Sequence, residues 1–95
     1  MITIEDIREK SKAVFNRYPV KKVSVFGSYA KGDQTKESDI DFLIKDSNIS
    51  LLELSGLKQL LSETFNTSVD LVCENDLSDI FKFLIRDDEV MIYEK

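Results

Sequence analysis

The sequence predicts an α/β (α+β) domain, a small mixed β-sheet of about four strands with helices packed on it. Short apolar runs of strand length recur along the 95 residues, and longer stretches with helical periodicity separate them. Polar or glycine-containing turns lie between these stretches. We expect one domain, residues 1–95, because a chain of this length supports a single modest core.

Helices and strands alternate along the chain. Helices are expected over residues 3–18, 28–31, 50–65 and 76–86. Strands are expected over residues 21–26, 39–44, 68–73 and 90–93, the last at an edge of the sheet. The interval 32–38 is polar and unpatterned, as an exposed loop at a functional site would be.

Capping residues define the two long helices. Thr3 with Asp6, and Ser50 with Glu53, have the spacing of a capping box, and Pro19 ends the first helix. The apolar stripe expected on the second long helix comprises Leu54, Leu57, Leu61 and Phe65. Both helices are therefore expected to pack on the sheet.

The composition excludes several classes of function. The net charge of −5 argues against a protein that binds nucleic acid through its own surface, and a basic partner suits it better. The chain has no histidine, which excludes Ser-His and Cys-His nucleophile pairs and His-ligated zinc. Cys73, the single cysteine, lies in an apolar run and is expected to be a buried, reduced thiol. No apolar run is long enough for a membrane span and no signal peptide is visible, so we expect a cytoplasmic protein.

The stretch from the first strand to the second combines two features of a phosphate-handling site. Gly27 lets the backbone turn sharply after a strand, so that the following N–H groups and the Ser28 hydroxyl can point at one anion. Asp39 and Asp41 occupy positions i and i+2 of a strand, which places both carboxylates on one face, roughly 6–7 Å apart. Mg²⁺ prefers one or two carboxylates together with water and substrate phosphates. Either feature alone is common as an ordinary turn or a solvated strand end; their combination indicates a connected site.

Asp70 is a charged residue inside the third apolar strand. Such a residue faces water, a partner or a metal, or it is simply an exposed strand start. If this strand lies beside the second, with Asp70 level with the end that carries Asp39 and Asp41, the carboxylates would lie about 5 Å apart laterally. Three carboxylates this close repel one another, so at least one should have a raised pKa without metal. Ser38 is either a further hydroxyl ligand of this site or only a cap of the loop.

The order Gly-Ser, ten residues, Asp-x-Asp resembles the signature of the nucleotidyltransferase superfamily. The short, simple chain looks like the minimal nucleotidyltransferases that act as antitoxins to HEPN-domain toxins. One departure is visible, because the family usually has arginine where this chain has Lys31. Lysine keeps the charge but loses the bidentate geometry for phosphate.

The resemblance implies the nucleotidyltransferase fold and the transfer of AMP from ATP to a hydroxyl, with tyrosine expected, of a cognate HEPN toxin in a hetero-oligomeric complex. The residues expected to bind the nucleotide are Gly27, Ser28, Lys31 and Ser38. The residues expected to catalyse the transfer and to hold Mg²⁺, with two ions expected, are Asp39, Asp41 and Asp70. The family has a third acidic residue on the next strand, and Asp70 is the position of this chain that matches it. There it would complete the second metal site or accept the proton of the attacking hydroxyl.

Two alternatives stay open at this point. The chain could be a binding module that inhibits its partner sterically without catalysis. It could also be an enzyme that modifies a small molecule, although such nucleotidyltransferases usually carry an additional acceptor-binding domain.

Overall fold

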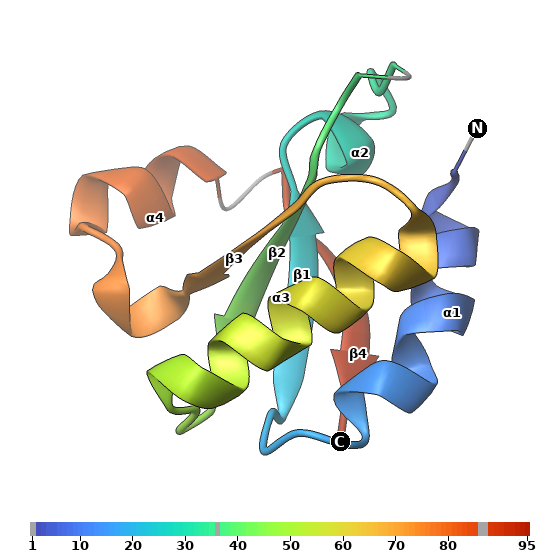
Figure 1. The fold of residues 1–95 in the computed structure, drawn as a ribbon. Coiled ribbons are helices and arrows are strands. Elements are labelled where there is room, and N and C mark those ends of the chain that lie inside the picture. The colour runs from blue at the N-terminus through green and yellow to red at the C-terminus, as the bar shows by residue number, and fades with distance from the viewer. Residues whose placement is uncertain (1, 36, 86–87) are drawn as a thin grey trace.

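A mixed four-stranded sheet of order β3-β2-β1-β4 forms the centre of the computed structural model, which describes residues 2–35, 37–85 and 88–95 (Figure 1). Its strands are β1 (Lys22–Phe26), β2 (Ile40–Lys45), β3 (Val69–Cys73) and β4 (Val90–Glu94). β1 pairs antiparallel with β2 and with β4, whereas β2 and β3 run parallel. The predicted fold class, and the predicted place of the last strand at an edge, are confirmed.

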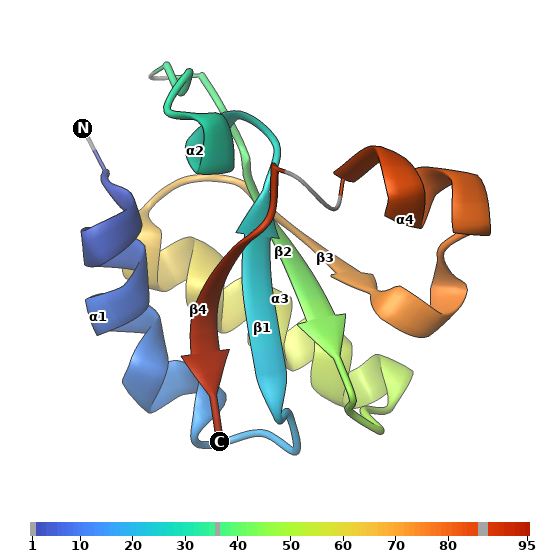
Figure 2. The ribbon, with the colours of Figure 1, turned by 180° about the vertical axis from the view of Figure 1, so that it is seen from behind.

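The two long helices cover one face of the sheet. The helices are α1 (Ile4–Phe15), α2 (Ser28–Lys31), α3 (Leu51–Phe65) and α4 (Asp79–Ile85), with a 3₁₀ turn η1 (Glu74–Asp76). α1 and α3 lie in front of the sheet in Figure 1 and behind it in Figure 2, where the opposite face is turned to the viewer. Both predicted capping boxes are present, at Thr3 with Asp6 and at Ser50 with Glu53. None of the described helices is long and apolar enough to cross a membrane.

The core lies between the sheet and the two long helices. Strand residues alternate as predicted, because Ile40, Phe42 and Ile44 of β2 are buried in this core. From the helices, Ile7, Phe15, Leu57 and Leu61 are fully buried. The ring of Phe15 contacts the ring of Phe42 edge-on, at a centroid distance of 5.7 Å. Burying these side chains contributes about 1.5–3 kcal/mol each and fixes which face of β2 remains free.

Two helix bounds differ from those predicted. α1 ends at Phe15, three residues before Tyr18, because the residue preceding Pro19 is disfavoured in helical conformation and the chain closes with tighter turns. The last helix begins after Ser78, whose hydroxyl accepts the Phe81 N–H at 3.2 Å, rather than at Asp76. The predicted end of that helix, Arg86, falls outside the described residues.

The surroundings of Cys73 and Gly56 explain two further features of the sequence. Cys73 is a free thiol, but it is half-buried rather than buried, and its burial, with the charge of Asp76, raises its pKa. Gly56 lies inside α3, where glycine costs roughly 1 kcal/mol relative to alanine. A Cβ at this position would lie 3.2 Å from the Tyr18 hydroxyl, so the glycine makes room for the chain that leaves α1.

Candidate active site

Asp41 and Asp70 lie side by side on neighbouring strands. β2 and β3 are parallel, and Asp41 is the direct partner of Asp70 in their register. Because Ile40 and Phe42 point into the core, Asp41 points to the face that the long helices leave uncovered. Asp39 precedes it by two residues and is exposed. The structure thus brings together the three predicted acids, which we call the acidic trio.

The Asp41 carboxylate has the most perturbed environment of the trio. Burial raises the pKa of Asp41 from 3.8 to about 6, and the negative charges of Asp70 and Asp39 and a hydrogen bond with Asp70 act in the same direction. This confirms the expectation that at least one carboxylate would resist ionisation without metal. The surroundings of this carboxyl stabilise its ionised form poorly, so a cation beside it would be favourable.

Gly27 sits directly against Asp41. Its backbone has φ 76° and ψ −148°, a conformation that is essentially restricted to glycine. A Cβ at position 27 would lie 2.6 Å from the Asp41 Oδ2 atom, closer than any real Cβ approaches a neighbour. The Gly-Ser turn therefore faces the Asp41 carboxylate, and Asp70 is the partner of Asp41 in the β2–β3 register.

The other residues predicted to bind the nucleotide differ in their hydrogen bonds and ion pairs. Ser28 is the first residue of α2, and its hydroxyl forms no hydrogen bond with any described residue. Lys31 ends α2 and forms an ion pair with Asp88 at 3.5 Å. The Ser38 hydroxyl accepts the Thr35 N–H at 2.8 Å, so in this state it caps the loop.

Two contacts close to the acidic trio were not predicted from the sequence. The ring of Phe81 on α4 packs edge-on against Phe26, the residue before Gly27, at a centroid distance of 6.2 Å. The Lys58 ammonium of α3 lies 4.0 Å from Asp70, where both side chains are more than half exposed and the attraction is weak. Neither contact can be predicted from neighbouring residues in the sequence, because each joins residues far apart along the chain.

Comparison with known proteins identifies the family of this chain. A family model described as "Polymerase beta, Nucleotidyltransferase" matches residues 9–95. The chain belongs to this nucleotidyltransferase family. It is also similar to protein adenylyltransferase MntA of Thermococcus cleftensis, with 34% identity over 93 residues that cover 92% of this chain and 94% of that protein.

Solved structures extend the likeness of this nucleotidyltransferase to its fold. A crystal structure of a toxin-antitoxin with AMP-PNP matches with a TM-score of 0.79 at 21% identity, over 93% of this chain and 73% of that chain. A complex of MNT antitoxin with tri-AMPylated HEPN toxin from Shewanella oneidensis matches with a TM-score of 0.73 at 17% identity, over 98% of this chain and 74% of that chain. At these identities the likeness establishes the fold alone.

The donor set of this nucleotidyltransferase fits a hard cation such as Mg²⁺. Among the described residues, no three His, Cys, Asp or Glu side chains are arranged to hold a metal by themselves. Mg²⁺ does not require such a cage, because it keeps several waters and completes its octahedron with substrate phosphates. Two or three carboxylates, one of them with a pKa of about 6, would supply the oxygen ligands that this coordination needs.

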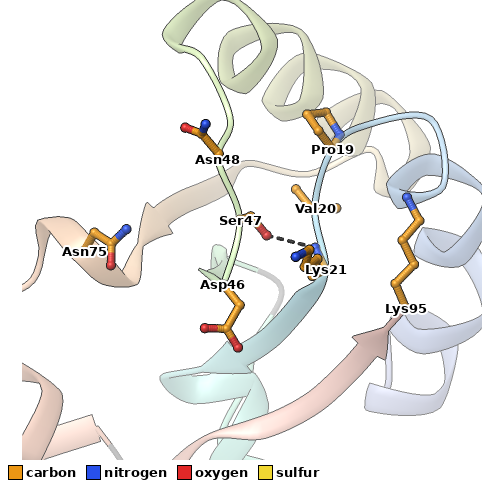
Figure 3. Close-up of a pocket in the computed structure, with 8 residues that line it drawn as sticks. All are labelled: Pro19, Val20, Lys21, Asp46, Ser47, Asn48, Asn75 and Lys95. Atoms are coloured by element: carbon orange, nitrogen blue, oxygen red, sulfur yellow. Dashed lines mark hydrogen bonds between the residues drawn. The ribbon is translucent and has the colours of Figure 1, made fainter.

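A pocket of about 510 Å³ lies at the other end of the sheet (Figure 3). The residues that line it are Pro19, Val20, Lys21, Asp46, Ser47, Asn48, Asn75 and Lys95. The Ser47 hydroxyl accepts the Lys21 N–H there at 2.8 Å. The length of β1 separates this pocket from the acidic trio, so its volume says nothing about the nucleotidyltransferase site.

Replacing Gly27 tests the close approach of Asp41. Gly27→Ala should lower the free energy of unfolding by about 3 kcal/mol or more, because backbone strain and the contact with Asp41 add. Gly32→Ala is the matched control, since Gly32 has φ 78° but nothing within 4 Å of its Cβ position, and it should cost about 1 kcal/mol. Urea unfolding measures both, and equal costs would contradict the close contact.

The raised pKa of Asp41 predicts a pH dependence of stability in the metal-free chain. The folded state binds more protons than the unfolded state between pH 3.8 and about 6, so the free energy of unfolding falls as pH rises through this window. Asp41→Asn removes the charge and should therefore stabilise the chain at pH 7 by about 1–2 kcal/mol after solvent screening, with little effect near pH 4.

Urea unfolding with EDTA at both pH values measures this difference. Glu63→Gln, an exposed change on α3, serves as the control and should be neutral at both. A variant Asp41→Asn that is less stable than the wild type at pH 7 would contradict the assigned environment.

Proposed function

We propose that this nucleotidyltransferase is an antitoxin that transfers AMP from ATP to a tyrosine hydroxyl of a cognate HEPN toxin and thereby silences it. The observation that carries the proposal is the close approach of Asp41, with Asp70 as its partner on the next strand, to the Gly27-Ser28 turn. The near full-length likeness to a protein adenylyltransferase supports the reaction. The fold shared with an MNT antitoxin in complex with an AMPylated toxin supports the acceptor.

The nucleotide would bind at the turn between β1 and α2. Gly27 brings the turn close to the Asp41 carboxylate, and the Ser28 hydroxyl, which has no hydrogen bond among the described residues, could donate to a phosphate oxygen. Lys31 would contact the phosphates as a point charge after exchanging its ion pair with Asp88. Ser38 would contribute only if its hydroxyl leaves the Thr35 N–H.

Asp39 and Asp41 would hold Mg²⁺, with Asp70 completing the site for a second ion. When bound, the metal would neutralise phosphate charge and orient the α-phosphorus for in-line displacement. The protein supplies the rest of the geometry, because the core fixes the direction of Asp41 and the β2–β3 register fixes its distance from Asp70. Occupation of the site would also favour the ionised form of Asp41.

At the α-phosphorus, the transfer forms one bond and breaks one. The acceptor oxygen bonds to the α-phosphorus, the bond from that phosphorus to the bridging oxygen of the β-phosphate breaks, and pyrophosphate leaves with its electron pair. The hydroxyl proton would go to a carboxylate of the site, and Asp70, which is exposed and pairs with Asp41, would accept it when it is not a metal ligand.

Labelled ATP tests the reaction. The chain is incubated with ATP labelled at the α-phosphate, Mg²⁺ and the HEPN toxin of the same source organism, and mass spectrometry locates the label. Wild type should label a toxin tyrosine, and Asp41→Asn should lower the rate at least about 100-fold because ligand and charge are lost together. Glu63→Gln should act as wild type.

Two outcomes would contradict the proposal. An Asp41→Asn variant that silences the toxin without labelling it would establish steric inhibition, and label on a small hydroxyl compound alone would overturn the protein acceptor.

Thermal unfolding tests the metal. With nucleotide present, Mg²⁺ at about ten times its Kd should stabilise the chain by about 1.4 kcal/mol, a rise of several degrees in Tm. The rise should weaken in Asp39→Asn and Asp41→Asn, although Asp41→Asn starts from a higher Tm in EDTA at pH 7. A Tm that Mg²⁺ leaves unchanged with and without nucleotide would contradict the metal site.

A further inference from the structure

Asp88 is an acid at the edge of the candidate active site that the proposed reaction does not use. β1 and β4 pair antiparallel, with Val25 opposite Val90. Gly27 follows the first of these residues by two positions and Asp88 precedes the second by two, so both lie at the same end of the sheet. Figure 2 shows the start of β4 beside the end of β1, at the end of the sheet where α2 lies. Asp88 therefore lies close to the turn that is expected to bind phosphate.

The Asp88 carboxylate neutralises the cation that is expected to contact the triphosphate. Its Oδ2 atom lies 3.5 Å from the Nζ atom of Lys31, and the side chains of Asp88 and Lys31 are 39% and 50% exposed. Lys31 forms no other ion pair with the residues that the structure describes. Its ammonium is thus already paired with an anion, and an ion pair this exposed is weak enough for a phosphate to displace.

The neighbouring residue, Glu89, holds Asp88 in place. The Glu89 carboxylate accepts the hydroxyl of Ser24, a fully buried residue of β1, at 2.7 Å. It also pairs with Lys45 of β2, and the side chains of this ion pair are 14% and 22% exposed. Because Glu89 is fixed to two strands, the adjacent Asp88 is held near the site. A phosphate bound there must either take Lys31 from Asp88 or lie beside a pair that is already neutral.

Both arrangements oppose the binding of phosphate. If Lys31 leaves Asp88, the attraction within their ion pair is lost, and if it stays, it offers the phosphates no net charge. The acidic trio differs in this respect, because Mg²⁺ would neutralise those carboxylates. Asp33, two residues after Lys31, is exposed and forms no ion pair with a described residue, so solvent screens its charge. Asp88 is therefore the acid whose partner the phosphates also need.

We propose that Asp88 is an internal competitor of the nucleotide for Lys31. It limits how tightly ATP is held, and it pairs with the lysine again as pyrophosphate departs, which favours release of that product. Asp88 is thus a positioning residue that acts through Lys31 and touches no reacting atom. The inference rests on the proposed function, because it assumes that Lys31 contacts the phosphates of ATP.

Asp88→Asn tests the competition, since it removes the charge and keeps the shape of the side chain. Calorimetry on the full chain measures binding of an ATP analogue whose bridge between the α- and β-phosphates cannot be cleaved, with Mg²⁺ present. Pyrophosphate is titrated in the same way. Both ligands should bind about two- to fivefold more tightly to the variant than to the wild type, the range expected for an exposed ion pair. High salt should reduce this difference, and the Tm of the variant should match that of the wild type.

A double-mutant cycle and a matched control identify the cause. Lys31→Gln should itself weaken binding of the analogue about tenfold, and in this background Asp88→Asn should lose most of its effect. Asp46→Asn is the control, because it breaks an ion pair of the same length, 3.5 Å to Lys22, at the other end of β1. Asparagine tolerates the positive φ of 49° at that position. This control removes the same net charge and should leave both affinities unchanged.

The outcomes distinguish this inference from the proposed function. An Asp88→Asn variant that binds the analogue as the wild type does, or more weakly, would overturn the competition even if the wild type labels the toxin. Tightening that persists in the Lys31→Gln background, or that Asp46→Asn reproduces, would assign the effect to net charge and would also overturn it. Wild type that binds the analogue but labels no toxin would refute the proposed reaction, and tighter binding by Asp88→Asn would still support the competition.

Discussion

The close approach of the Asp41 carboxylate to the backbone of Gly27 is the constraint on which the site depends. It requires a residue without Cβ, in a conformation that only glycine adopts readily, at the end of β1. It also places a carboxyl where burial and two neighbouring acids oppose its ionisation. This arrangement lowers the stability of the chain at neutral pH, because the folded state must ionise a carboxyl that its surroundings disfavour as a charge.

The sheet holds this unfavourable arrangement in place. Ile40 and Phe42 on either side of Asp41 are fully buried beneath α1 and α3, so a slip of β2 by one residue would move the carboxylate into the core. The parallel pairing with β3 sets Asp70 beside it. Because the core acts on one face only, the opposite face remains available for charge.

Polar contacts stabilise the face of the sheet that the two long helices leave uncovered. The Glu89 carboxylate accepts the Ser24 hydroxyl at 2.7 Å and forms an ion pair with Lys45, and the side chains of this pair are 14% and 22% exposed. These contacts join β1 and β2 to the segment that leads into β4. The same segment carries Asp88, the partner of Lys31, so the sheet and the end of α2 are linked through adjacent residues.

The sequence by itself determined the features that depend on neighbouring residues. Capping boxes at Thr3 and Ser50, alternation along β2 and the Gly27-Ser28 turn could be predicted because each is decided within about one helical turn or one strand. Only the tertiary structure decided that β3 lies parallel to β2 and that α4 approaches Phe26, since sheet order and long-range packing have no local signal. The pairing of Lys31 with Asp88 belongs to the same class, because two exposed charges find each other only once the fold has brought their loops together.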